Sequence, residues 1–257
     1  MTTSCSELLV RAKRLGLHGL VAHWNEQGTA PWVASLLELE EAERTQRSLE
    51  RRIRSARLGR FRAMADFDWS WPRKIDRAQV EELFGLDFIG EGENPIFIGP
   101  NGVGKTLLAQ NLAHHALLRG FTVLFTTASE MLGDLASRDS SHALQQRLRR
   151  YARPQLLVVD EVGYLSYDNR HADLLFQVIT RRYERPGCAT IVTTNKPFGE
   201  WNQVFPNVAS VVTLIDRLTH RAEVVQIDAD SYRFKESKQR AADKAKRRQS
   251  RSKASRG

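Results

Sequence analysis

The stretch that most constrains the fold is "GPNGVGKT", residues 99–106. It fulfils the phosphate-loop pattern G-x-x-x-x-G-K-[ST], whose fixed positions are Gly99, Gly104, Lys105 and Thr106. The apolar run Pro95–Ile98 precedes it, and the helical pattern Leu107–Arg119 follows it. Because this motif needs a strand before it and a helix after it, the sequence predicts a nucleoside triphosphate site within an α/β fold.

Each residue type in this loop has a physical role. Glycines allow backbone N–H groups to turn inward around phosphate oxygens, and the N-terminus of the next helix adds its dipole. Lys105 is expected to neutralise the β- and γ-phosphates, and the Thr106 hydroxyl to bind Mg²⁺. The expected nucleotide-binding residues are Gly99, Pro100, Asn101, Gly102, Val103, Gly104, Lys105, Thr106 and Leu107.

Strand-like and helical segments alternate around this loop. Five apolar runs are expected to form strands: Pro95–Ile98, Thr122–Thr126, Leu156–Asp160, Ala189–Thr194 and Val224–Ile227. Most of the intervals between them have helical periodicity, as in His171–Tyr183. This alternation predicts a parallel sheet with helices on both faces.

A second chemical signal is "LLVVDE", residues 156–161. Its four apolar residues predict a buried strand, and Asp160 at the carboxyl end of that strand is expected to hold Mg²⁺. Glu161 is a second carboxylate, which can orient and polarise an attacking water. The pair therefore favours hydrolysis over transfer to a substrate hydroxyl.

The stretch "IVTTNKPF", residues 191–198, allows two interpretations. Asn195 could begin the N-K-x-D motif that selects guanine, but Phe198 stands where that motif needs an aspartate, so this interpretation fails. Alternatively, Asn195 ends a strand between the phosphate-loop strand and the Asp160 strand, where its amide would sense the γ-phosphate. A simple strand-ending asparagine remains a further alternative.

The first seventy residues have helical periodicity. A first helical segment is expected to stop at Gly28, and a second helix to run from Pro31 to about Arg62. Four arginines of the second helix lie on one face and are candidate DNA-binding residues: Arg44, Arg47, Arg51 and Arg54. The guanidinium group binds phosphate oxygens bidentately. A solvated face, paired with nearby glutamates, is the alternative.

Charge and composition restrict the class of protein. The 257 residues have a formal net charge of +9, and ten Lys or Arg against two acidic residues lie in 235–257. This segment is expected to be disordered. It could be a DNA-contacting arm, or it could be only a solvated, positively charged end. No apolar stretch is long enough for a bilayer span and no secretory signal is apparent, so a cytoplasmic location without membrane contact is expected.

Arg217 and Arg221 follow near the end of the predicted folded region. If subunits assemble head to tail, an arginine here could reach the γ-phosphate of a neighbour and stabilise transition-state charge. Arg217 is the preferred candidate, and an ion pair with Asp216 is the alternative interpretation.

Five stretches together carry a family resemblance: "RLGLHGLVAHWNEQ", "GPNGVGKT", "LLVVDEVGYLSYD", "LLFQVITRRYERPGCATIVTTNKPFGEW" and "LIDRLTHRAEVVQIDADSYRFKES". They resemble the IstB family, the ATP-binding helper proteins of bacterial insertion sequences, close relatives of the helicase loader DnaC within the AAA+ ATPases. The resemblance implies an ATPase that assembles on duplex DNA as a head-to-tail homo-oligomer, a ring or a spiral, and activates a partner transposase. It implies ATP and Mg²⁺ as cofactors. It assigns hydrolysis to Glu161, γ-phosphate sensing to Asn195, a trans-acting arginine to Arg217, and Mg²⁺ binding to Asp160.

The resemblance implies an AAA+ core behind a helical N-terminal domain, and the expected limits are 1–68 for the helical DNA-binding and oligomerisation domain and 69–234 for the AAA+ core. A basic tail is expected at 235–257. After Ser237 this tail lies outside the resemblance, so a DNA role for it rests on charge alone. Forty residues after Arg217 are too few for a full helical lid, so Arg233 is the remaining candidate for a second sensor. Leu107 replaces the histidine of many relatives and is compatible with helix packing. A helicase loader and a small-molecule kinase remain the alternatives, although no arginine-bearing lid for a kinase is apparent.

Overall fold

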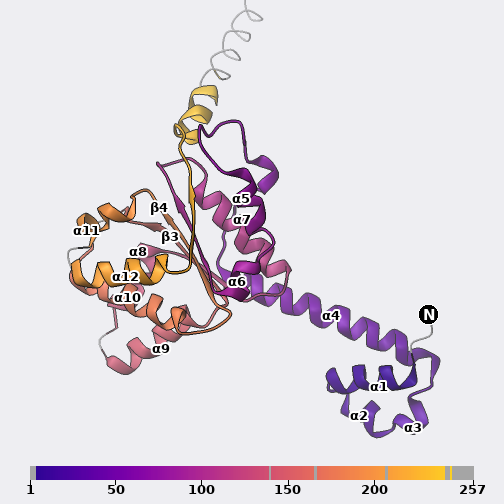
Figure 1. The fold of residues 1–257 in the computed structure, drawn as a ribbon. Helices are drawn as coiled ribbons and strands as arrows, with labels where there is room; N and C mark the ends of the chain where they lie inside the picture. The colour runs from indigo at the N-terminus through magenta and orange to yellow at the C-terminus, as the bar shows by residue number, and fades with distance from the viewer. Residues whose placement is uncertain (1–3, 139, 165–166, 206–207, 241–243, 245–257) are drawn as a thin grey trace, which may run out of the picture. The chain divides into compact units, whose positions relative to one another are not determined.

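The computed structural model describes residues 4–138, 140–164, 167–205, 208–240 and 244 (Figure 1). By compactness the chain divides into two units, Met1–Arg54 and Ser55–Gly257. Residues 55–68, which the sequence analysis places in the N-terminal domain, therefore belong to the second unit. The functional domain limits after residues 68 and 234 stay predictions. Most of the predicted basic tail lies outside the described residues.

The first unit is helical, as expected. It consists of α1 (Cys5–Arg14), α2 (His18–Ala22), α3 (Trp24–Gln27) and most of α4 (Pro31–Ala56). The segment before Gly28 forms three helices: α1 ends at Arg14 with Leu15 as its C-cap, and Gly16 takes a positive φ of 64°. Ser4 caps α1 through a reciprocal pair of hydrogen bonds with Glu7. The small core of this unit consists of Ala12, Leu15, Val33 and Leu37.

Helix α4 ends earlier than the sequence predicts. Its last residue is Ala56, not a residue near Arg62, and Arg57 adopts the left-handed conformation with a φ of 57°. A residue in that conformation cannot continue a right-handed helix. Arg60 and Arg62 therefore lie outside the helix, in the second unit.

The second unit is built on a five-stranded parallel sheet. Its strands are β1 (Asn94–Ile98), β2 (Val123–Thr127), β3 (Leu156–Val162), β4 (Ala189–Thr194) and β5 (Ala222–Gln226), in the spatial order β2-β3-β4-β1-β5. Each of the five predicted strands is present within two residues of its expected limits. Strand β4 lies between β1 and β3, so the expected position of the strand that precedes Asn195 is confirmed.

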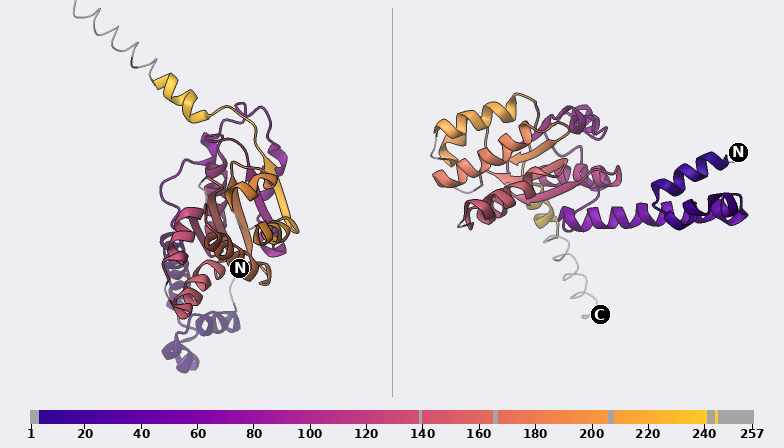
Figure 2. Two further views of the ribbon diagram at one scale, coloured as in Figure 1. Left: turned by 90° about the vertical axis from the view of Figure 1, so that its left-hand side faces the viewer. Right: turned by 90° about the horizontal axis from the view of Figure 1, so that it is seen from below.

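Helices cover both faces of this sheet (Figures 1 and 2). One face, with Phe97 and Val158, packs against α5 (Arg77–Leu83), α6 (Asp87–Glu91) and α7 (Lys105–Leu118). The other, with Ile96 and Val159, packs against α8 (Ala128–Ala136), α9 (Ser141–Ala152), α10 (Asn169–Tyr183), α11 (Trp201–Val204) and α12 (Val208–Thr219). Neighbouring strand residues point to opposite faces, so strands covered on both sides have apolar residues on both faces.

Two local features stabilise elements around this sheet. Asp76 caps α5 by accepting a hydrogen bond from the Gln79 N–H at 3.0 Å. Arg182 of α10 is almost fully buried and donates hydrogen bonds to Thr190 and to five backbone carbonyls, among them that of Ala189. It thereby ties α10 to the start of β4.

Two short 3-10 helices lie at Met64–Asp66 and Phe198–Glu200, and residues 232–240 are helical. Cys5 is exposed and Cys188 is buried, and both are free. Among the described residues, we find no helix that has both the length and the apolar character needed to cross a membrane.

Candidate nucleotide site

The candidate site lies where β1, β3 and β4 end. Asp160 is only 3% exposed, and its Oδ1 accepts hydrogen bonds from the Thr106 hydroxyl at 3.0 Å and from the Thr193 hydroxyl. Burial raises the pKa of this carboxyl, although both hydroxyl donors oppose the shift. The structure thus brings together the two residues that the sequence assigns to Mg²⁺. A carboxylate and a hydroxyl oxygen are donors that fit this ion.

The phosphate loop has the shape that its glycines permit. Gly102 and Gly104 have φ values of 79° and 104°, which residues with a Cβ rarely adopt. A Cβ at Gly99 would lie 2.2 Å from the carbonyl oxygen of Ile227. Helix α7 begins at Lys105, so its free N–H groups lie at the loop. This arrangement fits the phosphates of a nucleotide.

Lys105 extends along the inside of the loop. Its Nζ donates hydrogen bonds to the carbonyl oxygens of Gly99 and Pro100, both at 2.7 Å, and lies 3.5 Å from the Tyr164 hydroxyl. The residue is only 4% exposed. Burial lowers the pKa of Lys105 to about 8, while the charge of Asp160 opposes the shift. The lysine is therefore a partly desolvated cation beside the loop.

Glu161 is positioned by an irregular strand end. Its φ is 62°, and its N–H donates to the Thr193 hydroxyl at 3.0 Å. The register of β3 against β4 shifts between Val159 and Val162. A bulge of this kind redirects a side chain, and Glu161 lines the loop pocket. A non-glycine residue in the left-handed region at such a place is a feature typical of functional sites.

Asn195 follows the last residue of β4. Its Oδ1 is buried, and among the described residues it has no hydrogen-bond partner. A buried unpaired acceptor is uncommon in proteins and indicates a group that a ligand or water completes. Asn195 does not line the loop pocket itself, so the structure places it at the adjacent strand end.

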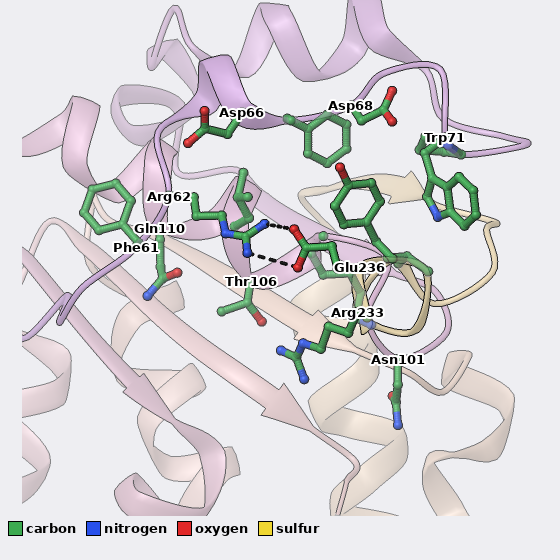
Figure 3. A pocket seen from close by; sticks show the side chains of 18 of the residues that line it. Phe61, Arg62, Asp66, Asp68, Trp71, Asn101, Thr106, Gln110, Arg233 and Glu236 are labelled. Atoms are coloured by element: carbon green, nitrogen blue, oxygen red, sulfur yellow. Dashed lines mark hydrogen bonds and ion pairs between the residues drawn. The ribbon is translucent and has the colours of Figure 1, made fainter. Parts of the chain in front are cut away.

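The pocket over the loop has a volume of about 350 Å³. Figure 3 shows its side chains, with Thr106 and Asn101 on the loop side and Arg62, Asp66, Asp68 and Trp71 on the opposite side. Tyr232, Arg233 and Glu236 form a third wall. Among these outer-wall residues, only Arg233 is a site candidate from the sequence. The aromatic-rich stretch "DFDWSWP" at 66–72 was the available signal for the second wall.

Arg233 brings a positive charge to the pocket. Its charge contributes to lowering the pKa of Lys105, so the two cations influence each other across the site. An exposed guanidinium lining the pocket fits the second sensor that the sequence analysis considers, and that role stays a prediction.

Arg217 lies elsewhere. It donates a hydrogen bond to the Thr180 hydroxyl, and its guanidinium lies 4.8 Å from the centre of the Phe176 ring. The backbone of nearby Arg221 accepts a hydrogen bond from Asn94, the first residue of β1, whereas the phosphate loop follows the last residue of that strand. Arg217 is therefore near the amino ends of the strands, away from its own loop. Among the described residues it makes no ion pair with Asp216.

Comparison with known proteins decides the family. The model for the family "IstB-like ATP binding protein" matches residues 10–240. This chain belongs to that family. The IstB-like chain is 34% identical over 231 residues, 90% of its length, to an insertion sequence IS5376 putative ATP-binding protein of Geobacillus stearothermophilus, and it covers 91% of that relative.

Further relatives agree with this assignment. An insertion sequence IS21 putative ATP-binding protein of Pseudomonas aeruginosa is 36% identical over 79% of the IstB-like chain and 76% of its own. Among solved structures, a DNA replication initiation factor is 25% identical with a TM-score of 0.50, and the match covers 64% of this chain and 49% of that one. The fold of the second unit is the P-loop AAA+ fold that the sequence predicts.

The arginines of α4 belong to the first unit of the IstB-like chain. Arg44 pairs with Glu40 at 3.1 Å, and Arg47 pairs with Glu43 at 2.5 Å. Within the described part of the chain, Arg51 and Arg54 are exposed and have no ion-pair or hydrogen-bond partner. Half of the candidate DNA-binding set is therefore engaged within its own helix, and the other half presents unpaired guanidinium groups.

Proposed function

We propose that this IstB-like chain is an ATPase that assembles on duplex DNA in an ATP-dependent manner and stimulates the transposase of its insertion sequence. The observation that carries the ATPase is the position of Glu161. The left-handed turn at the end of β3 directs this carboxylate into the pocket beside the phosphate loop. A carboxylate there can accept a proton from water.

The residues around Glu161 have complementary tasks in this proposal. Backbone N–H groups of the loop and Lys105 bind the phosphates, and Asp160 with Thr106 holds Mg²⁺. When bound, that ion supplies charge neutralisation at the phosphates. Asn195, at the end of the strand between β1 and β3, orients the γ-phosphate or the attacking water through its amide. Arg217 lies far from its own loop, so it acts on the site of a neighbouring subunit in a head-to-tail homo-oligomer.

The link to DNA rests on family membership and charge. The IS5376 and IS21 relatives are named as ATP-binding proteins of insertion sequences, elements whose movement needs a transposase. Arg51 and Arg54 offer unpaired guanidinium groups for phosphates, with Arg44 and Arg47 beside them. A cytoplasmic location follows from a DNA target inside the cell.

Gel-shift titration of duplex DNA tests the proposal. Wild-type protein is expected to form large complexes with ATP, and weaker complexes with ADP. Lys105→Ala removes the phosphate-binding cation and is expected to behave with ATP as wild type does with ADP. Equal binding in all three cases would exclude nucleotide control of assembly. Capture of a replicative helicase together with weak duplex binding would instead support a helicase loader.

A further inference from the structure

Two segments that are distant in the sequence form the outer walls of the nucleotide pocket. The first, the linker segment, comprises residues 61–74, and the second, the C-terminal segment, comprises residues 228–236. Both touch the phosphate loop. A Cβ at Gly104 would lie 2.7 Å from the Phe67 ring, and the Tyr232 N–H donates to the Gly102 carbonyl at 3.0 Å.

Several contacts join the two segments to each other. Lys74 and Asp228 exchange a pair of backbone hydrogen bonds at 3.1 and 2.9 Å. Trp71 Nε1 also donates a hydrogen bond to the Asp230 carbonyl at 2.8 Å. Two ion pairs join the segments as well, Arg73 with Asp230 at 3.1 Å and Lys235 with Asp68 at 3.2 Å. The C-terminal segment is therefore held against the linker segment whether or not any single ion pair is present.

One further contact lies inside the pocket. Arg62 donates two hydrogen bonds to the carboxylate of Glu236, Nη1 to Oε1 at 2.6 Å and Nη2 to Oε2 at 3.0 Å. Figure 3 shows this pair at the centre of the pocket, facing Thr106 of the phosphate loop. The carbonyl oxygen of Arg62 accepts a hydrogen bond from Asn111 of α7 at 2.9 Å. The helix that begins at the loop thus fixes the backbone of Arg62.

The charges of the pocket make this pair unusual. Three other carboxylates line the pocket or its base, Asp66, Asp68 and Glu161. Asp68 is neutralised by Lys235, and Glu236 by Arg62. A triphosphate that enters the pocket brings several negative charges, which repel any carboxylate and attract any guanidinium. A guanidinium fork binds phosphate oxygens bidentately, as it binds a carboxylate.

We propose that Glu236 and the bound nucleotide compete for Arg62, so that Arg62 is a nucleotide-binding residue that the C-terminal segment restrains. This inference rests on the proposed ATP binding. In the nucleotide-free protein Glu236 holds the guanidinium. Phosphate or ribose oxygens take its place when nucleotide binds. Glu236 then keeps a second partner, Arg240, whose Nη2 lies 4.0 Å from Oε2. Nucleotide binding thereby loosens the end of the C-terminal segment.

A calorimetric titration with Mg²⁺ and a non-hydrolysable ATP analogue, with a methylene bridge between the β- and γ-phosphates, tests the competition. Glu236→Gln removes the competing charge and is expected to tighten analogue binding by up to about fivefold, the limit for a half-exposed ion pair. Arg62→Gln removes a charged hydrogen-bond donor and is expected to weaken binding by about ten- to a hundredfold. The opposite changes in affinity distinguish competition from a purely structural role of the Arg62–Glu236 ion pair, which predicts weaker binding in both variants. A gain in affinity also cannot arise from misfolding.

The double variant Arg62→Gln/Glu236→Gln separates exchange from simple repulsion. If the nucleotide takes Arg62 from Glu236, the second substitution has no effect once Arg62 is absent. The same tightening in both backgrounds, or weaker binding by Glu236→Gln alone, would overturn the proposal. Arg73→Gln, which breaks an ion pair between the same segments outside the pocket, is the matched control and is expected to bind like wild type. Failure of wild type to bind the analogue would overturn the ATPase proposal itself.

Discussion

At the scale of single residues, Lys105 combines a positive charge with burial. Its pKa of about 8 is lower than the usual value because burial disfavours the charged form. Below pH 8 the free protein carries the charge, and above pH 8 it increasingly does not. Bound phosphates favour the protonated lysine, so ATP affinity is expected to fall as the pH rises from about 8, by up to roughly tenfold per pH unit.

Equilibrium titrations of ATP between pH 7 and about 9.5 would measure this dependence. Lys105→Arg is the matched variant, because an arginine stays protonated throughout this range. Its affinity, even if weaker overall, is expected to vary little with pH. A wild-type affinity that stays constant over the same range would contradict the role of Lys105 as a titrating phosphate ligand.

At the residue scale, the sequence indicates which candidate site residues lie together only where the signal is local. The phosphate loop, Asp160 and Glu161 are adjacent to apolar runs that form β1 and β3, and the structure brings them to one edge. Arg62 gave no such signal. In the sequence it is one of several arginines near α4, and its partner Glu236 lies 174 positions away. Only the folded chain brings these two residues together.

At the scale of elements, strands were easier to predict than helix ends. Strands β1 to β4 have apolar residues on both faces because both faces are buried. Helix α4 was predicted too long, because the sequence after Pro31 contains no further proline before Arg62 and no glycine before Gly59. Arg57 ends the helix in a left-handed conformation that sequence patterns seldom reveal.

The arginines of α4 lead to a prediction about DNA binding. Replacing Arg51 and Arg54 together by Ala is expected to reduce the slope of log affinity against log salt concentration by roughly 2, because each phosphate contact contributes about 0.9. Replacing Arg44 and Arg47 is expected to change the slope less, since Glu40 and Glu43 already neutralise them.

Fluorescence anisotropy of labelled duplex DNA at several salt concentrations would give both slopes. The two double variants remove the same charge from the same helix, so each is the control for the other. A larger effect of the Arg44 and Arg47 substitutions would show that the pairs with glutamate open on DNA, and that the unpaired residues are only solvated.

At the scale of the whole molecule, the site described is incomplete for rapid hydrolysis if Arg217 acts on a neighbour. Arg217 lies toward the amino ends of the strands, while the phosphate loop lies at their carboxyl ends. No arrangement of this sheet brings both ends together within one chain. The sequence indicates Arg217 as a candidate. It does not indicate which phosphate loop Arg217 would reach, because that loop would belong to a neighbouring subunit.

Mixing two inactive variants would test this division of the site. Arg217→Ala keeps its phosphate loop but lacks the arginine, and Lys105→Ala keeps the arginine but lacks phosphate binding. Each alone is expected to lose ATPase activity, by about a thousandfold for Arg217→Ala. Arg217→Ala should still bind ATP, because Arg217 does not line its own pocket. In a mixture, an Arg217→Ala loop that faces a Lys105→Ala neighbour has every required group, so part of the activity should return.

Activity that stays absent at every mixing ratio, while mixed oligomers form, would exclude Arg217 as the trans-acting residue. Arg221→Ala in the same mixture would then test the other arginine near that edge, which lies against the Tyr183 ring.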